Sequence, residues 1–257
     1  MARILKNRLL FLKGKTTIHL LLLSVVFFFA PGEADAQRRF SQTFPASRDV
    51  RLTLNNRSWT VTVSGWNRPE VHVQAYLEAP AATINPQVID GTIFLNIVKD
   101  NYGRADIGSV NFDIRVPFDA SVDIETKIGN LNVSSVRGTF VRAKISSDGD
   151  ITLTNISARW VTAENGIGNI FFDGDIQSNG AYRFTSMRGD INLRVPFNSS
   201  FKLVATAPST RSISLGSFAN GNMRFLGDGR RVTGQFGDGS SSITVTNQRG
   251  SIAFIRR

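Results

Sequence analysis

The sequence predicts an all-β fold: a single-domain, β-helix-like β-solenoid whose rungs have about 20 residues and two strands each. Three observations predict it. A Gly-Asn/Asp-Ile/Leu tripeptide recurs at intervals of 20, 19 and 21 residues, beginning at Gly129, Gly149, Gly168 and Gly189. The residues between the copies alternate between apolar and polar types, and no helical pattern follows Gln37. Each repeat of such an architecture buries its apolar face only against its neighbours, so we expect the repeats to stack in sequence order.

The first 36 residues have the pattern of a secretory signal peptide. Basic residues between Arg3 and Lys15 precede an apolar run from Leu20 to Ala30, and Ala34-Asp35-Ala36 places small residues at the cleavage positions. The apolar run has 11 residues, fewer than the roughly 20 that span a bilayer, which favours a cleaved signal over a retained membrane anchor. We therefore expect an extracytoplasmic protein, located in the periplasm, on the cell surface or secreted, with no stable transmembrane span after cleavage.

We expect residues 37–43 to be a short N-terminal linker and residues 44–257 to form one β-strand repeat domain. Strand-like alternation begins early, in Val50–Leu54, Trp59–Val63, Val71–Ala75 and Ile93–Ile97. These segments lack the tripeptide. We therefore expect them to form less regular rungs that cap the N-terminal end of the solenoid.

Superposing the repeats predicts the core. The residue after the Gly-Asn/Asp pair and the residue two positions later are apolar in every copy, and a spacing of two places both on the same face of a strand. The first column is Leu131, Ile151, Ile170, Ile191 and Ile252, and the second is Val133, Leu153, Phe172, Leu193 and Phe254. The last member of each column belongs to a variant copy, Gly250-Ser251-Ile252, which lies 61 residues after Gly189, close to three more periods.

The turns of the repeat would place Asn130, Asp150, Asn169 and Asp190 above one another at the usual strand spacing of about 4.8 Å. Charged and neutral residues alternate in this column. Adjacent carboxylates would repel each other at that distance, so our hypothesis is that the amide between them relieves the repulsion.

The net charge and the cysteine content limit the possible partners. The chain carries +10, and its first 36 residues hold five basic and two acidic residues, which leaves 10 − 3 = +7 for the mature part. This charge favours anionic surfaces, but the basic residues are scattered, so we expect no nucleic-acid partner. The absence of cysteine removes disulfides, a lipid-modified N-terminus, a thiol nucleophile and thiolate metal sites. We expect neither a cofactor nor a metal.

The sequence resembles the bacterial "putative adhesin" family, a domain of unknown function found in envelope and secreted proteins. The resemblance rests on Val61–Val71, on the Val116-Pro117 and Val195-Pro196 segments, on the recurrent Gly-Asn/Asp-Ile turns, and on Ser242–Ile252. It covers most of residues 44–257. It implies a β-strand repeat fold and an extracytoplasmic location, and it implies no catalytic residues.

The candidate catalytic groups each have a structural interpretation. His72 lies in an alternating strand and has no Gly-x-Ser-x-Gly elbow nearby, so we expect an outward strand histidine. Asp148-Gly149-Asp150 and Asp173-Gly174-Asp175 could supply paired carboxylates for glycosidic cleavage or ligands for calcium, but tight turns also require Asp and Gly. Arg188-Gly189-Asp190 spells an integrin-recognition tripeptide, yet it falls on the repeat's own turn.

Three aromatic residues are the candidate binding residues. Phe171 occupies an outward position in the superposed repeats, and Trp66 and Trp160 are further surface candidates. Aromatic rings on a flat sheet face can stack on sugars or anchor a partner protein. A register slip of one residue would bury Phe171 instead, which is the alternative at this position.

These observations favour a non-enzymatic, exported protein of the cell envelope or surface that serves as an adhesin-like binding scaffold. Its partner would be an envelope or extracellular glycan or another envelope protein. Two alternatives stay open: a polysaccharide-active enzyme that uses the turn aspartates, and a purely structural accessory protein of the periplasm.

Overall fold

Alternating apolar and polar side chains produce strands along most of the computed structural model, which describes residues 38–99, 102–103, 108–227 and 229–257. The all-β prediction is confirmed. Within these ranges the helical elements are two short 3₁₀ helices, η1 (Thr210–Ser212) and η2 (Gly216–Asn220). The predicted signal peptide, residues 1–36, lies outside the described residues.

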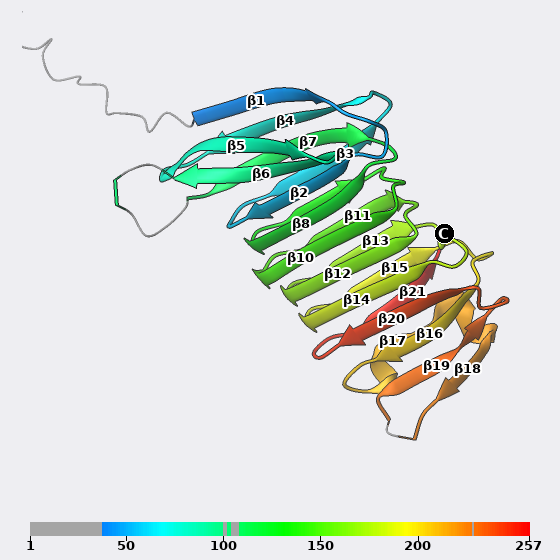
Figure 1. Ribbon diagram of the computed structural model, residues 1–257. Coiled ribbons are helices and arrows are strands. Elements are labelled where there is room, and N and C mark those ends of the chain that lie inside the picture. Colours follow the sequence, from blue (N-terminus) through cyan, green and yellow to red (C-terminus); the bar gives the residue numbers. More distant parts are fainter. Residues whose placement is uncertain (1–37, 100–101, 104–107, 228) are drawn as a thin grey trace, which may run out of the picture. The chain divides into compact units, whose positions relative to one another are not determined.

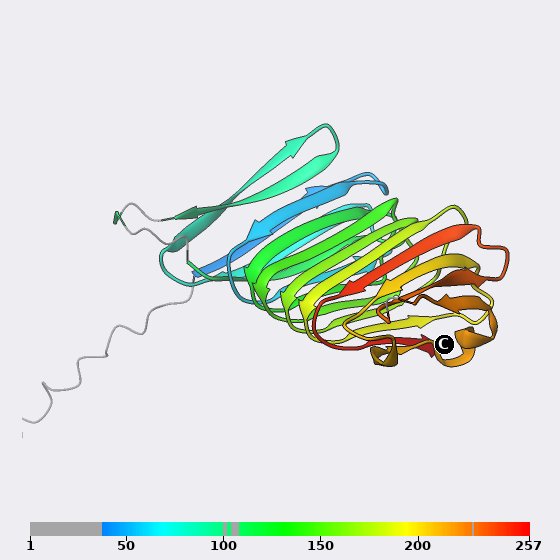
Figure 2. The same cartoon turned by 90° about the horizontal axis from the view of Figure 1, so that it is seen from below.

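The strands form two sheets that lie face to face and enclose a continuous apolar core (Figures 1 and 2). Sheet A contains, in spatial order, β1 (Arg38–Pro45), β4 (Glu70–Leu77), β7 (Val110–Pro117), β3 (Val61–Trp66), β9 (Leu131–Ser134), β11 (Ile151–Ile156), β13 (Ile170–Gly174), β15 (Ile191–Val195), β21 (Ile252–Arg256) and β17 (Ile213–Ser214). Sheet B contains β18 (Asn222–Phe225), β19 (Arg231–Phe236), β16 (Phe201–Thr206), β20 (Ser241–Asn247), β14 (Ala181–Arg188), β12 (Trp160–Ile167), β10 (Phe140–Asp148), β8 (Ser121–Ile128), β2 (Arg51–Asn56), β6 (Thr92–Lys99) and β5 (Ala81–Ile89).

A strand of sheet B and the strand of sheet A that follows it form one rung, which confirms the predicted solenoid of two-stranded rungs. Strands of neighbouring rungs are parallel in both sheets. In the described residues the rungs numbered 1 to 8 are, in stacking order, β6/β7, β2/β3, β8/β9, β10/β11, β12/β13, β14/β15, β20/β21 and β16/β17.

Both predicted apolar columns form the core of sheet A. Ile151 is in register with Leu131 on one side and with Ile170 on the other, and the column continues through Ile191 to Ile252. All five side chains of this column are fully buried, and the column two residues further on is buried as well. Each such side chain contributes roughly 1.5 to 3 kcal/mol on burial, so the two columns are a main source of stability.

The uneven period of the repeat has a local cause. Strand β10 carries a register shift between Ile145 and Asp148 relative to both neighbours, which adds one residue to its rung. The turn after β13 covers residues 175–180, whereas the turn after β11 covers only residues 157–159. The variation therefore lies in turns and in bulges, and the paired strands change register only at those bulges.

Glycine is required at the turn that leads from sheet B to sheet A, which we call the glycine edge (Gly129, Gly149, Gly168, Gly189 and Gly250). Gly168 has a φ of +124°, and a Cβ atom at this position would lie 2.1 Å from the carbonyl oxygen of Gly149. A Cβ atom at Gly189 would clash in the same way with the carbonyl oxygen of Gly168. Successive turns therefore approach so closely that a side chain has no room.

The residue after each of these glycines forms a hydrogen-bonded ladder. The side-chain oxygen of Asn130 accepts the backbone N–H of Asp150 at 3.0 Å, and Asp150 accepts the N–H of Asn169 at 2.6 Å. Asn169 accepts the N–H of Asp190 at 2.9 Å, and Asp190 accepts the N–H of Ser251 at 2.7 Å. Asn and Asp interchange here because both carry the oxygen acceptor that the next turn needs.

Buried polar side chains support the same edge from inside the solenoid. The amide of Asn165 donates to the Gly149 carbonyl at 2.8 Å, and the amide of Asn247 donates to the Gly189 carbonyl at 2.8 Å. Both asparagines lie three residues before a glycine of the edge, a regularity that the sequence analysis missed. They satisfy backbone carbonyls that the solenoid would otherwise bury without a partner.

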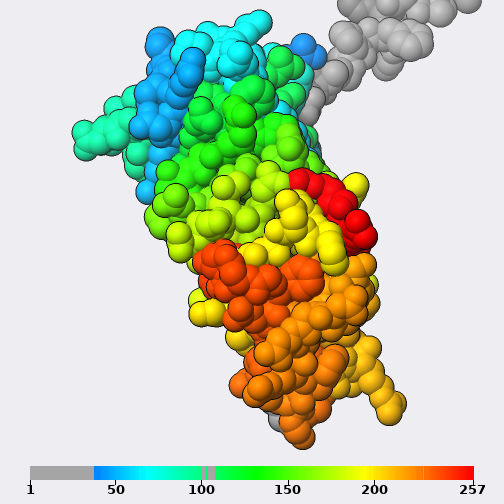
Figure 3. Space-filling model, turned by 90° about the vertical axis from the view of Figure 1, so that its right-hand side faces the viewer, coloured from blue at the N-terminus to red at the C-terminus, as the bar shows by residue number. Residues whose placement is uncertain are grey.

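The rungs follow sequence order only in the middle of the solenoid. Gly250 follows Gly189 by about three periods along the chain, yet β21 pairs directly with β15, and rung 7 lies between rungs 6 and 8. The segment between β15 and β20 contains rung 8 and the strands β18 and β19, and we call these elements the C-terminal cap. In Figure 3 the red C-terminal residues accordingly lie between the green rungs and the orange cap.

The N-terminal end has the same kind of insertion. Rung 2, which comes first in the chain, lies between rungs 1 and 3. Antiparallel strands cover both ends: β4 and β1 extend sheet A, β5 pairs with β6, and β19 pairs with β16. The expected linker needs correction, because residues 38–43 belong to β1 and pair with β4, which anchors Phe44 in the core.

We expect Gly168→Ala to lower the free energy of unfolding by about 3 kcal/mol or more, because it combines a strained φ with a clash against a backbone oxygen. Gly91→Ala is the matched control. Gly91 also has a positive φ, +72°, but no heavy atom lies within 4 Å of the new methyl group, so only the strain of about 1 kcal/mol applies. Urea denaturation measures both, and equal losses would contradict the close-stacking interpretation.

We expect Asn169→Asp to lower the melting temperature at about 0.01 M salt and to have a smaller effect at about 1 M, because three carboxylates would then be adjacent in the ladder. Asn192→Asp makes the same charge change on the outer face, where the partners in register are Phe171 and Ala253. Thermal denaturation of both variants at the two salt concentrations tests the electrostatic role of the amide. An unchanged melting temperature for Asn169→Asp would show that this role is absent.

Candidate functional site

The structure places the three predicted aromatic residues on different surfaces. Phe171 points outward from β13 in sheet A and is half-buried, so the register slip that would bury it does not occur. Trp160 lies at the start of β12 in sheet B, 47% exposed, beside Phe140 in register. Trp66 lies at the end of β3. The three residues therefore do not form one site.

Trp66 is held firmly in its place. Its indole N–H donates to the carbonyl of Glu70 at 2.8 Å. The guanidinium groups of Arg68 and Arg115 lie 4.9 and 5.8 Å from the centre of its rings, within the range of cation–π attraction.

Trp66 belongs to the edge of the solenoid opposite the glycine edge. This edge, which we call the return edge, consists of the turns that follow β1, β3, β7, β9, β11, β13 and β15. It contains two neighbouring hollows of about 120 and 480 Å³ that share the lining residues Asp119 and Arg137, and we call the two hollows together the return-edge groove. The first hollow is lined by Arg48, Trp66, Asn67, Arg68, Pro69, Pro117, Phe118, Asp119 and Arg137, and the second by Asp49, Asp119, Arg137, Gly138, Thr139, Ser157, Arg159 and Gln177.

Arginines dominate the charge of the return-edge groove. Arg137 lies 4.7 Å from the ring of Phe118 and 3.7 Å from the carboxylate of Asp119. The side chains of Arg48 and Arg159 are exposed and have no hydrogen-bond or ion-pair partner among the residues that the structure describes. An unpaired guanidinium is a ready ligand for a carboxylate or phosphate.

The sequence analysis missed this groove, although one signal pointed to it. Val116-Pro117-Phe118 and Val195-Pro196-Phe197 are equivalent turns, and the guanidinium group of an arginine from another rung lies over the ring of each phenylalanine. Arg137 covers Phe118, and Arg256 covers Phe197 at 4.8 Å. The echo between the two segments therefore marked a recurrent Phe–Arg contact of the return edge.

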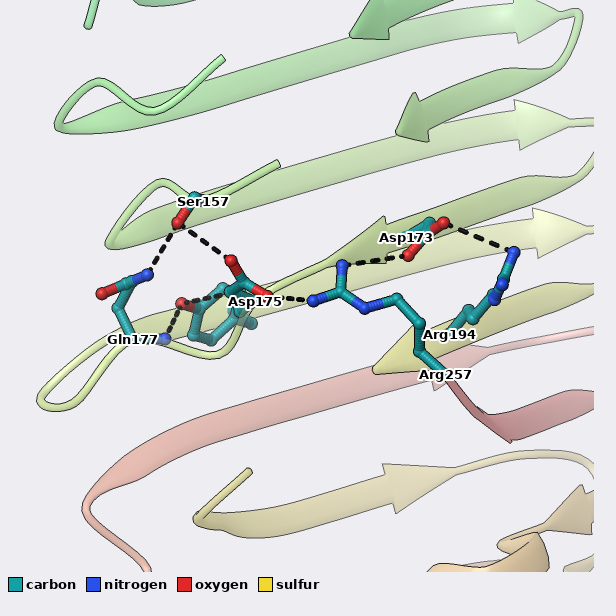
Figure 4. A network of polar contacts seen from close by, with 7 residues as sticks. Ser157, Asp173, Asp175, Gln177, Arg194 and Arg257 are labelled. Atoms are coloured by element: carbon teal, nitrogen blue, oxygen red, sulfur yellow. Dashed lines mark hydrogen bonds and ion pairs between the residues drawn. The ribbon is translucent and has the colours of Figure 1, made fainter. Parts of the chain in front are cut away.

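The Asp173-Gly174-Asp175 pair forms a brace between rungs rather than an open acidic pair (Figure 4). The carboxylate of Asp173 lies 3.5 Å from both Arg194 and Arg257. Asp175 also pairs with Arg257, and it accepts a hydrogen bond from Ser157 at 3.2 Å. Both carboxylates are therefore neutralised, and neither lines the return-edge groove.

A buried tyrosine completes this brace. The hydroxyl of Tyr182 donates to the carbonyl of Ala158 at 3.1 Å and accepts the backbone N–H of Gln177 at 2.6 Å. Burial raises the pKa of Tyr182 to about 12. The side-chain amide of Gln177 donates to Ser157 at 2.7 Å, which places a polar pair against the groove.

The remaining candidates are occupied by structural contacts. In the Asp148-Gly149-Asp150 segment, Asp150 belongs to the ladder of the glycine edge. His72 faces outward from β4, and its Nδ1 is 2.8 Å from the hydroxyl of Thr43. In Arg188-Gly189-Asp190, the carboxylate accepts both the N–H and the hydroxyl of Ser251. Among the described residues, no three His, Cys, Asp or Glu side chains gather closely enough to hold a metal ion.

Comparison with known proteins identifies a family of domains. Residues 83–253 match the family model described as Toastrack DUF4097. No curated protein matches the chain. In the part that the structure describes, no helix has the length and apolar character needed to cross a bilayer.

Three solved structures are similar to this chain at low identity. The first is a "putative cell adhesion protein" from Clostridium sporogenes, with 13% identity, 85% of this chain and 97% of that chain covered, and a TM-score of 0.49. The second is a "putative adhesin" from Bacteroides fragilis, with 11% identity, coverage of 86% and 99%, and a TM-score of 0.41. The third is a "putative lipid binding protein" from Parabacteroides distasonis, with 10% identity, coverage of 85% and 97%, and a TM-score of 0.39.

The carboxylate of Asp190 predicts part of the pH dependence of stability. The hydrogen bonds from Ser251 lower the pKa of Asp190 below its ordinary value of 3.8, so the folded state favours the ionised carboxylate. This contribution is present above the unfolded pKa and is lost as the pH falls through the folded one. We expect the melting temperature of Asp190→Asn to fall less than that of the wild type between about pH 5 and about pH 3.

Thermal denaturation across this range measures the effect. Glu78→Gln, which changes an exposed acidic residue away from the ladder, serves as the control and should follow the wild-type curve. If Asp190→Asn has the same acid sensitivity as the wild type, the ladder contact does not contribute to it.

Proposed function

The chain belongs to the Toastrack DUF4097 family, and we propose that it is a non-enzymatic, exported binding scaffold of the cell envelope or surface. The family match agrees with the resemblance that the repeat motifs suggested. Export is supported by the first 36 residues, which combine a basic stretch, an apolar run and a small-residue cleavage site. A repeat solenoid suits a binding role because its stacked rungs present extended, rigid surfaces.

The return-edge groove is the observation that carries the proposed binding function. It combines a concave surface, exposed arginines without partners in the described residues, and the immobilised ring of Trp66. Binding residues are commonly found on turns that a rigid scaffold holds in position, and these turns are anchored on both sides by paired strands. Phe171 and Trp160 remain additional candidate contacts on the outer faces of sheets A and B.

The enzymatic alternative has weaker support. Glycosidic cleavage uses two carboxyl groups that flank the scissile bond, one of which must act as an acid. Asp173 and Asp175 are paired with arginines instead, and Asp150 holds a backbone N–H of the next rung. We therefore propose binding without turnover, with an envelope or extracellular glycan, or another envelope protein, as the partner.

We expect the native host to export the protein with Gln37 as its first residue, and we expect the purified protein to cosediment with envelope glycan from that host without releasing reducing ends. Cell fractionation with N-terminal sequencing tests export. Cosedimentation together with a reducing-end assay tests binding. Asp175→Asn should cosediment as the wild type does, because Asp175 lies outside the groove.

Recovery of the protein in the cytoplasm would contradict export. Release of reducing ends that Asp175→Asn or Asp150→Asn abolishes would establish the enzymatic alternative. Export without any binding would leave the structural accessory protein as the remaining function.

A further inference from the structure

The return-edge groove also indicates the chemistry of its ligand. Its positively charged lining residues are Arg48, Arg68, Arg137 and Arg159, and its negatively charged lining residues are Asp49 and Asp119. The groove therefore carries a net positive charge of 4 − 2 = +2, which favours an anionic ligand.

The cations follow the stacking direction. Arg137 and Arg159 come from the turns after β9 and β11, which belong to the neighbouring rungs 3 and 4, and Arg48 comes from the loop before β2 of rung 2. Rungs of parallel strands stack about 4.8 Å apart, so these turns offer cationic groups at successive steps along the solenoid. Such an arrangement suits a linear polymer with a regularly repeated negative charge.

The acidic and neutral polar residues of the return-edge groove narrow the class of its ligand further. Asp119 is paired with Arg137, but a site that recognised only charge would gain nothing from the carboxylate of Asp49, because it repels an anion. Carboxylates, amides and hydroxyls are useful where a ligand also presents many hydroxyl groups that need acceptors and donors. Thr139, Ser157 and Gln177 supply such groups in the second hollow.

Two aromatic residues give the first hollow an apolar wall. Trp66 and Phe118 are both half-buried and line it together with Pro69 and Pro117. The rings are immobilised by their arginine contacts, so they provide an apolar wall at low entropic cost. An apolar wall beside dense polar groups matches a sugar ring, which has an apolar face and a polar rim.

We propose that the return-edge groove binds a linear acidic polysaccharide whose carboxylates are held by Arg48, Arg137 and Arg159 and whose hydroxyl groups are held by Asp49, Thr139 and Gln177. This inference rests on the proposed binding function and names the class of its ligand. The guanidinium fork matches a carboxylate in a bidentate geometry, which makes a uronate the simplest ligand of this class.

Affinity measurements with three polymers test the ligand class. The probes are polygalacturonate as the acidic polysaccharide, dextran as a neutral polysaccharide, and poly-L-glutamate as a carboxylate polymer without sugar hydroxyls. At about 0.15 M salt we expect polygalacturonate to bind at least about tenfold more tightly than poly-L-glutamate, and dextran not to bind. Equal binding of poly-L-glutamate and polygalacturonate would overturn the proposal, as would the absence of polygalacturonate binding.

Matched double variants test the location of the site. Arg48→Gln with Arg159→Gln should weaken polygalacturonate binding by at least about tenfold, because each substitution removes a fork that can bind a carboxylate. Arg183→Gln with Arg224→Gln makes the same change of charge on exposed residues of β14 and β18, outside the groove, and should change the affinity by less than about twofold. Equal losses in the two double variants would show that net charge alone drives binding, which would overturn the site.

A substitution of the acidic residue gives a test of opposite sign. Asp49→Ala removes a negative charge from an exposed position, so a purely electrostatic site would bind polygalacturonate more tightly. If Asp49 accepts hydrogen bonds from sugar hydroxyls, binding becomes weaker, by about threefold or more. Tighter binding would overturn the assignment of Asp49.

The outcome separates this inference from the proposed function. Cosedimentation with host envelope glycan, together with no affinity for polygalacturonate, would overturn the acidic-polysaccharide inference and leave the binding scaffold intact. If the protein neither cosediments with host envelope glycan nor binds polygalacturonate, both the proposed binding function and the acidic-polysaccharide inference are overturned. Circular dichroism and melting temperatures of the variants establish that they are folded, which is expected because Arg48, Asp49 and Arg159 are exposed.

Discussion

The close stacking of turns at the glycine edge is the constraint on which the rest of the structure depends. The carbonyl of one glycine occupies the space that a side chain of the next would need. This proximity brings each following Asn or Asp within hydrogen-bond distance of the next turn. Because the edge is held at one spacing, the apolar residues that follow fall into register and are fully buried. One tripeptide therefore supplies the backbone conformation, the hydrogen-bond acceptor and the core side chain.

A stack of parallel strands leaves an unpaired edge at each end, and at each end of this protein a rung made from one part of the chain is inserted beneath a rung made from another part. Antiparallel strands then cover both sheets at the N-terminal end and sheet B at the C-terminal end, where the parallel strand β17 is the last strand of sheet A. Exposed strand edges invite pairing with other chains, so such coverage protects an extended solenoid from association through its ends. The insertion also ties segments distant in sequence to the regular rungs, since β21 lies between β15 and β17.

The two edges of the solenoid differ in a way that separates stability from binding. The glycine edge is uniform, because every turn must fit closely over its neighbour. The return edge has turns of different lengths, and these turns do not have to repeat one another. Variation in length leaves hollows between turns, and variation in composition allows arginines, aspartates and aromatic residues to line them. The brace formed by Asp173, Asp175 and Arg257 shows that the same edge also contributes cross-rung ion pairs.

The sequence by itself determined the repeating unit, because its residues act locally: glycine for a positive φ, Asn or Asp as an acceptor, and apolar residues two positions apart for one strand face. The outward position of Phe171 and the stacking of Asp150 over Asn169 follow from that periodicity. Only the tertiary structure decided the order of rungs at the ends, because the distance from Gly189 to Gly250 along the chain does not say which strand edge is free. It alone also brought Arg48, Trp66 and Arg159 to one groove, because their turns share no motif and become neighbours only when the rungs stack.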